Sequence, residues 1–266
     1  MTKDKGQRSK SIIHFAHANG FPAKTYSKLF KFLENDFEIN YIERHAHNPK
    51  FPVSDGWEFL KDELKTELEN RYTQPIIGVG HSLGGILHLL VAAENPQFYQ
   101  QIILLDAPII SRLSSRGLQI LKLTKLVDRY SPSQITRFRR NLWETKDEAF
   151  DHFRQKPKFA AFDEDVLRDY VEYGTVKAEK GFDLFFNQQI EAKIYRTIPH
   201  NLPNLRGKLS IPLTYIGGTH SREGELARLS FMKKHFPTYF REIEGSHLFP
   251  FEKPLETAEI IKQVIR

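Results

Sequence analysis

The sequence predicts an α/β protein with a mostly parallel sheet of about six strands, helices on both faces of the sheet and a helical insertion. Short apolar runs alternate with amphipathic segments up to about residue 108, and the alternation resumes near residue 208. Successions of strand, helix and strand build a parallel sheet whose faces are covered by helices. The residues between the two alternating parts lack this pattern. We therefore expect four segments, which are a flexible basic tail (1–10), a first part of the core (11–108), a helical cap (109–207) and a second part of the core (208–266).

The elements of the core follow from short apolar runs and from apolar residues spaced three or four apart. Strands are expected at residues 11–16, 37–42, 74–79, 101–106, 211–217 and 239–243. Helices are expected at residues 24–34, 55–68, 85–94, 222–236 and 254–265. In the second of these helices, for example, Trp57, Leu60 and Leu64 recur at the spacing of one helix face.

The inserted segment is expected to be mainly helical. Its candidate helices are residues 113–129, 132–141, 146–154 and 164–178. Open parallel sheets bind ligands outside the carboxyl ends of their strands. A helical insertion in such a sheet is therefore expected to form a cap over those strand ends.

Composition excludes several classes of protein. The chain has no run of 18 or more apolar residues, so no membrane-spanning helix is expected. The polar N-terminus lacks the apolar segment of a secretory signal. Because the chain has no cysteine, disulfides, thiol chemistry and cysteine-ligated metals are excluded. These features favour a cytoplasmic protein.

The net charge of +6 is distributed unevenly along the chain. Residues 1–10 carry four basic side chains and one acidic side chain, and Arg137, Arg139 and Arg140 form the densest basic patch of the insertion. Such a patch can contact nucleic acid or an anionic surface. Charge runs of this length more often lie on a solvated helix face. We therefore expect no nucleic-acid partner.

Residues 80–84 form a Gly-x-Ser-x-Gly motif centred on Ser82. The motif lies between a predicted strand and a predicted helix. A serine on such a sharp turn is held in strained backbone geometry, with its hydroxyl exposed at the end of the sheet. The flanking glycines remove Cβ atoms that would clash there. In this context the motif predicts a nucleophilic serine.

A serine hydroxyl needs an adjacent base to act as a nucleophile at neutral pH, and that base needs a group to orient it. His247 is the candidate base. It follows the last predicted strand, where a loop can place its side chain over Ser82.

Three segments together resemble the capped α/β-hydrolases. They are the motif at residues 80–85, the Gly-x-His segment at 245–247 and the His-Ala-Asn-Gly-Phe-Pro segment at 17–22. The chain order, with the serine first and the histidine last, is also the order of that superfamily. The resemblance covers about residues 11–108 and 209–266. It implies the α/β-hydrolase fold, with the cap inserted after the strand that ends at Asp106. The superfamily's first antiparallel strands have no counterpart here, so about six strands are expected instead of eight.

The resemblance also implies an oxyanion hole, because acyl transfer develops negative charge on the carbonyl oxygen and backbone N–H groups stabilise it. Leu83, the residue after the nucleophile, corresponds to one donor. The second donor lies in the segment 17–22. An ungapped match to the superfamily's His-Gly-x pattern makes Asn19 the donor, whereas a match to the Gly-Phe-Pro stretch makes Phe21 the donor.

The acidic member of the triad has two candidates. The superfamily's most frequent position follows the strand at 211–217, where the chain has His220 near the expected place and Glu223 as the nearby carboxylate. A second position in the superfamily is the end of the strand after the nucleophile helix, which here is Asp106. Glu223 also suits the first turn of a helix, where acidic side chains stabilise the helix dipole. We favour Asp106, with Glu223 as the alternative.

The predicted function is hydrolysis of a carboxylic ester of a small acyl substrate, through Ser82, His247 and Asp106 and an acyl-enzyme intermediate. Thioesterase, lactonase, amidase and cofactor-free peroxidase-type activities use the same triad. A non-catalytic ligand-binding protein with this fold is the alternative from another class. A serine at position 82 excludes the branches of the fold that use an aspartate nucleophile.

No cofactor and no metal are expected. The sequence has no phosphate-binding glycine loop. His45 and His47 lie at alternate positions, but no acidic partner or second cluster accompanies them, so this segment is interpreted as a polar loop.

Overall fold

The central sheet forms from the short apolar runs of the core. The computed structural model describes residues 10–265, so the predicted basic tail, except for Lys10, lies outside the described residues. Within them the sheet has the strand order β2-β1-β3-β4-β8-β9, and every neighbouring pair is parallel. The strands are β1 (Ser11–Ala16), β2 (Phe37–Tyr41), β3 (Ile76–His81), β4 (Tyr99–Leu105), β8 (Leu213–Gly218) and β9 (Thr238–Ile243). The predicted mostly parallel sheet of about six strands is confirmed.

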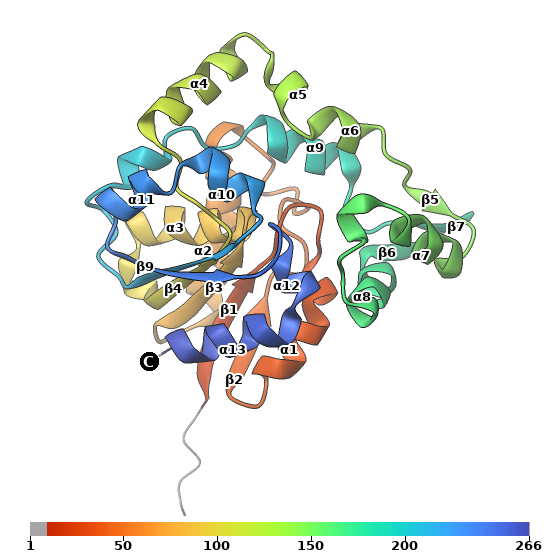
Figure 1. The fold of residues 1–266 in the computed structure, drawn as a ribbon, viewed down its shortest axis with the longest axis horizontal. Coiled ribbons are helices and arrows are strands. Elements are labelled where there is room, and N and C mark those ends of the chain that lie inside the picture. The colour runs from red at the N-terminus through yellow and green to blue at the C-terminus, as the bar shows by residue number, and fades with distance from the viewer. Residues whose placement is uncertain (1–9, 266) are drawn as a thin grey trace, which may run out of the picture.

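Helices cover both faces of this sheet (Figure 1). They are α1 (Ser27–Leu33), α2 (Glu58–Arg71), α3 (Leu83–Glu94), α10 (Arg222–Ala227), α11 (Ser230–His235), α12 (Phe249–Glu252) and α13 (Pro254–Val264). Short 3₁₀ helices occur at Ala23–Tyr26, Asp55–Trp57 and Pro96–Phe98. Alternate strand residues enter two separate apolar clusters, because successive side chains of a strand point to opposite faces. Ile103 and Leu105 pack in the cluster that contains α1 and α13, and Ile102 and Leu104 pack in the cluster that contains α2 and α3.

The topology brings three loops to one edge of the sheet. Ser82 follows β3, Asp106 follows β4, and His247 lies in the loop after β9. All of these strands are parallel, so their carboxyl ends meet at the same edge.

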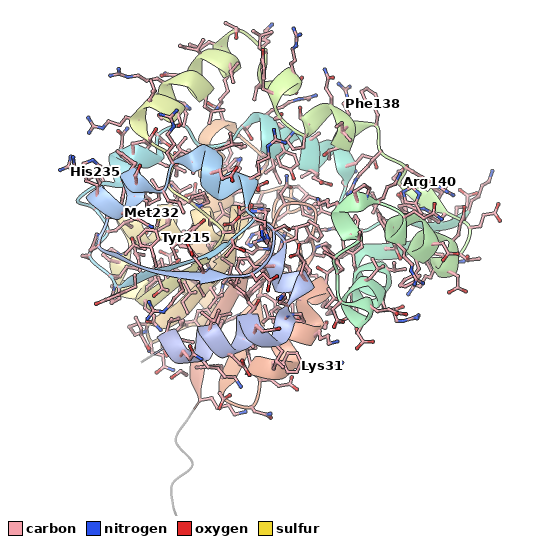
Figure 2. The ribbon with its side chains drawn as sticks, in the orientation of Figure 1. Lys31, Phe138, Arg140, Tyr215, Met232 and His235 are labelled. Atoms are coloured by element: carbon pink, nitrogen blue, oxygen red, sulfur yellow. The ribbon has the colours of Figure 1, made fainter. Side chains whose placement is uncertain are left out.

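The insertion after β4 lies across this edge, to the top and right of the core in Figure 1. Its helices are α4 (Arg112–Leu123), α5 (Val127–Tyr130), α6 (Ser133–Arg137), α7 (Lys146–Arg154), α8 (Glu164–Gly174) and α9 (Gln188–Arg196), with 3₁₀ turns at Pro157–Phe159 and Leu202–Leu205. Phe138 and Arg140 belong to the insertion, whereas Tyr215 and Met232 belong to the core (Figure 2). Phe138 is 77% exposed.

The insertion also contains an antiparallel sheet that the sequence interpretation missed. Its strands are β5 (Leu142–Trp143), β6 (Thr175–Ala178) and β7 (Gly181–Leu184). The helix predicted at 164–178 ends at Gly174, and the β-branched residues Thr175 and Val176 begin a hairpin instead. Gly181 has a φ of 95°, which lets the chain turn back. The predicted helix was therefore wrong for residues 175–178, and the helix predicted at 132–141 ends at Arg137.

Two other predicted helices are broken in the structure. The helix predicted at 113–129 ends at Leu123, and the one predicted at 222–236 divides into α10 and α11. Lys125 and Arg228 have positive φ values at these breaks. An α-helix cannot continue through a residue in that conformation. Within residues 10–265, no helix has the length and apolar character needed to cross a membrane.

Candidate active site

Ser82 lies on a tight turn between β3 and α3. Its backbone has φ 52° and ψ −113°, a conformation that is strained for a residue with a side chain. The Ser82 N–H donates to the carbonyl oxygen of Leu105 at 3.0 Å, which fixes the turn to β4. The glycines around the serine are needed for close packing. A Cβ at Gly84 would overlap the backbone of Ala16, and a Cβ at Gly80 would overlap the backbone of the following helix.

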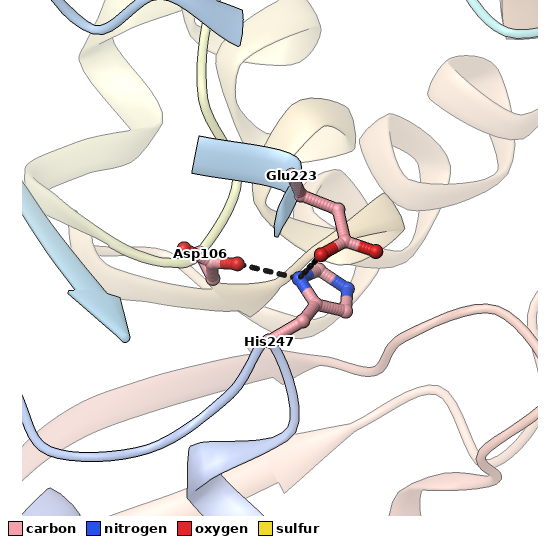
Figure 3. Close-up of side chains that lie close together, drawn as sticks. All are labelled: Asp106, Glu223 and His247. Carbon is pink, nitrogen blue, oxygen red and sulfur yellow. Dashed lines mark hydrogen bonds and ion pairs between the residues drawn. The ribbon is translucent and has the colours of Figure 1, made fainter. Parts of the chain in front are cut away.

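His247 and Asp106 are in direct contact at the same edge of the sheet. Nδ1 of His247 lies 2.6 Å from Oδ2 of Asp106 (Figure 3). The Asp106 side chain is buried, and its backbone has a φ of 45°. Its N–H donates to the carbonyl oxygen of Ile216 at 2.8 Å, which anchors the residue to β8. The imidazole therefore has a buried carboxylate fixed against Nδ1, which leaves Nε2 as the nitrogen for a proton acceptor.

Two further side chains hold the Asp106 carboxylate. The Tyr215 hydroxyl donates to Oδ1 at 2.8 Å, and the Ser221 hydroxyl donates to Oδ2. Burial alone raises the pKa of Asp106, but the hydrogen bonds from His247, Ser221 and Tyr215 outweigh burial and hold the pKa below its ordinary value. The aspartate is therefore ionised at neutral pH. The sequence analysis missed Tyr215 and Ser221. Tyr215 lay in a predicted strand like any core residue, and Ser221 had the position of a helix N-cap, a role that it also fills.

Glu223, the alternative acid, lies near the same histidine but farther away. Its Oε2 is 3.8 Å from Nδ1 of His247, and its side chain is 51% exposed. Figure 3 shows both carboxylates on the same nitrogen of His247. Asp106 is closer and buried, so the geometry favours Asp106. In the part of the chain that the structure describes, these three residues are also the one group with the spacing of a metal site, with ligand atoms within 4.8 Å of one another. The Nδ1 atom that would bind a metal there already faces Asp106.

His81 and Tyr26 connect the loop of His247 to the segment 17–22. Nε2 of His81 lies 2.9 Å from the carbonyl oxygen of His247, and Nδ1 of His81 lies 2.7 Å from the Tyr26 hydroxyl. The Ala18 N–H donates to the same hydroxyl at 3.1 Å. Tyr26 therefore donates its proton to Nδ1, and Nε2–H of a neutral His81 donates to the carbonyl. Burial, and then the nearby His247, lower the pKa of His81 to about 3, so the neutral form persists at physiological pH. Tyr26 and His81 were not identified from the sequence, because nothing about a tyrosine in a predicted helix indicates a hydrogen bond to a distant histidine.

The structure distinguishes between the two candidates for the second oxyanion donor. The Phe21 N–H already donates to the carbonyl oxygen of Ala18 at 3.1 Å. For the Asn19 N–H, no acceptor is present among residues 10–265. Leu83 is the first residue of α3, where a backbone N–H has no partner within its own helix. This geometry favours Leu83 and Asn19 as the pair of donors.

The segment 17–22 is held from the other side by helix α9 of the insertion. Nδ2 of Asn19 donates to the carbonyl oxygen of Glu191 at 3.1 Å. The Glu191 carboxylate packs over Gly20, where a Cβ would lie 2.6 Å from Oε1. Gly20 also has a φ of 83°, which favours glycine. The insertion thus positions the candidate oxyanion loop directly.

A cavity of about 1220 Å³ lies between the core and the insertion. Ser82, His247 and Asn19 line it from the core, and Tyr195, Ile198 and Phe159 are among the residues that line it from the insertion. Its size is sufficient for a small organic molecule, since ligand sites commonly occupy about 300–1,000 Å³.

His45 and His47 lie elsewhere and have structural contacts. His45 is buried, with Nδ1 3.5 Å from a carboxylate oxygen of Glu63. Nδ1 of His47 contacts the carbonyl oxygen of His45 at 2.8 Å, and Nε2 accepts from the Asn187 N–H at 3.0 Å. Neither histidine lines the cavity.

Comparisons with known proteins agree with this architecture. The sequence profile described as the Alpha/beta hydrolase family matches residues 15–260. Monoglyceride lipase from Mus musculus is 25% identical over 132 residues, which are 47% of this chain and 44% of the lipase. The abhydrolase domain-containing protein ACTT2 from Alternaria alternata is 27% identical over 229 residues, covering 71% of this chain and 82% of that protein. This chain therefore spans less than half the length of the mouse lipase that it matches.

Solved structures show the same fold. E-2-(acetamidomethylene)succinate hydrolase superposes with a TM-score of 0.74 at 17% identity, covering 97% of this chain and 91% of that chain. An esterase from M. tuberculosis superposes with a TM-score of 0.71 at 17% identity, covering 98% and 86% of the two chains. At this level of identity, the likeness concerns the fold alone.

Proposed function

The chain belongs to the alpha/beta hydrolase family, and from that premise we propose that it is a serine hydrolase that cleaves a small carboxylic ester. The observation that carries the proposal is the placement of Ser82 on a strained turn, in the same cavity as a histidine whose Nδ1 is held 2.6 Å from a buried aspartate. A relative supports an ester substrate, since it is named a monoglyceride lipase.

In the proposed mechanism, Ser82 Oγ attacks the carbonyl carbon of the ester while Nε2 of His247 takes the hydroxyl proton. Asp106 stabilises the resulting imidazolium through Nδ1. The backbone N–H groups of Leu83 and Asn19 donate to the oxygen of the tetrahedral intermediate. Each preorganised donor of this kind contributes roughly a hundredfold or more to the rate. Collapse of the intermediate expels the alcohol, which receives its proton from His247.

Deacylation repeats the same chemistry with water as the nucleophile. His247 takes a proton from water, the hydroxide attacks the acyl carbon, and Ser82 leaves as the protonated serine. The Tyr26–His81 series fixes the backbone carbonyl of His247 during both steps. The resting position of the histidine thus depends on a buried anchor as well as on Asp106.

We further propose that residues 109–207 act as a cap, with residues 11–108 and 208–266 as the catalytic core. The cap covers part of the cavity over Ser82 and replaces some of the water there with protein, which strengthens the electrostatic terms at the oxyanion. Its contacts with Asn19 and Gly20 make the cap part of the catalytic geometry as well as a cover.

The test is a panel of p-nitrophenyl esters of graded acyl length, with thioesters, lactones and amides alongside. Wild type should hydrolyse the esters fastest, and Ser82→Ala should lose about 10³-fold or more in kcat. Faster turnover of a thioester, lactone or amide would reassign the substrate class but keep the triad. Equal activity of wild type and Ser82→Ala would contradict the proposed function.

A further inference from the structure

The cavity next to Ser82 contains a lysine that the proposed triad mechanism does not use. Lys158 follows α7 in the cap and lines the cavity together with Ser82 and His247. Its Nζ lies 4.6 Å above the ring of Phe21, in the candidate oxyanion loop. Its ammonium group therefore contacts a side chain of that loop.

Lys158 has no direct ion pair with a protein anion. Among residues 10–265, it makes neither a hydrogen bond to a side chain nor an ion pair with a carboxylate, and Glu191 and Glu223 act on its charge only at longer range. Two acids lie near Lys158. Oε2 of Glu191 lies 2.5 Å from Nη2 of Arg139, and Oε2 of Glu223 lies 3.8 Å from Nδ1 of His247. The Glu191 side chain is almost fully buried. Arg139 and Glu191 thus compensate each other, and the charge of Lys158 remains.

Aromatic side chains surround the charge of Lys158 on the cavity side. Aromatic side chains of Phe21, Phe153 and Phe159 line the same cavity. Lys158 is exposed to solvent, and the protein around it still lowers the pKa of its ammonium group, mainly by desolvation. A lysine on a flexible stem usually extends into bulk water. Lys158 is exposed overall, but its ammonium group lies against the ring of Phe21 at the cavity wall, where an anion on a ligand would compensate its charge.

We propose that Lys158 forms a subsite for a carboxylate of the substrate, so that the preferred esters carry a negative charge remote from the ester bond. The inference rests on the proposed function, because the carboxylate is recognised while the ester carbonyl lies at Ser82. The Arg139–Glu191 pair borders the subsite and is neutral as a pair, so it does not cancel the charge of Lys158. The apolar walls would bind the methylene chain between the two polar ends of such a substrate.

The first test compares two substrates that differ by one charge. Mono-p-nitrophenyl adipate and p-nitrophenyl hexanoate have the same leaving group and acyl length, but only the adipate carries a carboxylate. Lys158→Met should lower kcat/KM for the adipate about 10- to 100-fold, the range for a lost charged hydrogen bond. The hexanoate should change less than about 3-fold, and Lys158→Arg should keep most of the preference.

Lys177 offers a matched control. Its Nζ lies 4.8 Å over the ring of Phe182, which is the same kind of contact, but it does not line the cavity. Lys177→Met should leave the adipate-to-hexanoate ratio of kcat/KM unchanged. In a second substrate pair the charge lies on the alcohol part. The butyrate ester of 4-hydroxybenzoate carries a carboxylate, and the butyrate ester of methyl 4-hydroxybenzoate is its neutral counterpart. For each variant, the ratio of kcat/KM for the charged substrate to kcat/KM for the neutral substrate is divided by the same ratio for wild type. This division removes the difference in chemical reactivity between the two substrates. Equal losses on the charged and neutral members of both pairs would overturn the subsite.

A binding measurement separates failure of the subsite from failure of the proposed function. Calorimetry with Ser82→Ala should show monomethyl adipate binding more tightly than methyl hexanoate, and Lys158→Met should remove the difference. If no ester is hydrolysed in a Ser82-dependent way but this difference is present, the subsite stands and the hydrolase proposal fails. If hydrolysis depends on Ser82 but no charge preference appears in kinetics or binding, the hydrolase proposal stands and the subsite is wrong.

Discussion

The hydroxyl of Tyr26 lies 2.7 Å from Nδ1 of His81 and joins the two loops on which the proposed catalysis depends. On one side it accepts the Ala18 N–H of the oxyanion segment, and on the other it orients His81 toward the carbonyl of His247. A single buried phenol thus sets the position of the candidate base relative to the candidate oxyanion hole.

Replacement of this hydroxyl should impair activity as well as stability. Tyr26→Phe leaves the Ala18 N–H and Nδ1 of His81 without their partner, at a cost of about 1–3 kcal/mol in the free energy of unfolding. We expect kcat for a p-nitrophenyl ester to fall about 10-fold, because His247 and the oxyanion segment lose their common anchor. Steady-state kinetics and urea denaturation measure the two effects.

Tyr99 provides the control for this substitution. Its hydroxyl makes a similar buried contact, 3.0 Å from Nδ1 of His88, but away from the candidate site. Tyr99→Phe should lower stability by a comparable amount and leave kcat unchanged at a temperature where both variants are folded. A parallel loss of kcat in both variants would reduce the role of Tyr26 to general stability.

Two glycines test the contact between the cap and the oxyanion segment. Gly20 and Gly56 both have positive φ values, 83° and 72°, so alanine is strained at either position. Only Gly20 faces a neighbour, since its Cβ would lie 2.6 Å from Glu191, whereas nothing lies within 4 Å at Gly56. Each alanine should cost about 1–2 kcal/mol of stability from the backbone alone.

Gly20→Ala should in addition displace the loop that carries the Asn19 N–H, and lower kcat by at least about 10-fold, a fraction of what one oxyanion donor contributes. Gly56→Ala should keep wild-type kinetics. Paired kcat and thermal unfolding measurements decide the matter. If Gly20→Ala is as active as Gly56→Ala, Asn19 is not a donor held in place by the cap.

Asp106 and Glu223 are distinguished by isosteric variants. Asp106→Asn keeps the shape but not the charge that stabilises the imidazolium, so kcat should fall by about 10⁴-fold. Glu223→Gln changes an exposed group at 3.8 Å and should lower kcat less than about 10-fold, as expected for a screened surface charge. The reverse order of effects would assign the acid to Glu223.

Stability should depend on pH through histidines that are buried in the neutral form. Burial, and then nearby His88, lower the pKa of His14 well below 6.5. Below pH 6.5 the unfolded chain therefore takes up a proton that the folded protein does not bind. Each such histidine lowers the free energy of unfolding by about 1.4 kcal/mol for every pH unit by which the solution is acidified. Burial lowers the pKa of His88 to about 3, so its contribution extends over the same range.

His14→Leu tests this dependence with little loss of native contacts. Neither ring nitrogen of His14 has a hydrogen-bond partner within the described residues. Between pH 6.5 and 5, the slope of the unfolding free energy against pH should be smaller than in wild type. The difference should correspond to the uptake of about one proton fewer on unfolding. Urea denaturation at several pH values measures the slope. An unchanged slope would mean that His14 is not buried in the neutral form.

The features predicted best from the sequence are those whose pattern lies within one short segment. Period and turn residues predicted the six core strands, and the glycines around Ser82 predicted the turn because only small residues fit against Ala16 and the helix backbone. The cap was predicted less well. Its hairpin at residues 175–184 depends on pairing with residues 142–143, which lie more than thirty positions earlier in the chain.

Interactions between distant segments could not be predicted at all. The partners of Asp106 come from β8 and from the start of α10, more than a hundred residues away, and the contact between Tyr26 and His81 joins separate elements. Lys158 gave no signal in the sequence, because its meaning depends on the cavity that surrounds it. The choice between Asn19 and Phe21 likewise required the backbone hydrogen bond of Phe21.

The most direct test of the central claim is covalent labelling of Ser82. A fluorophosphonate reacts with a serine only where a base and an oxyanion hole activate it. Intact mass spectrometry of the folded wild type should show one added phosphonyl group, which peptide mapping should place on Ser82. Ser82→Ala should show no added mass, and Asp106→Asn should label much more slowly. A wild-type protein that stays unlabelled while folded would contradict the account, and would make this chain a ligand-binding protein with the fold of a hydrolase.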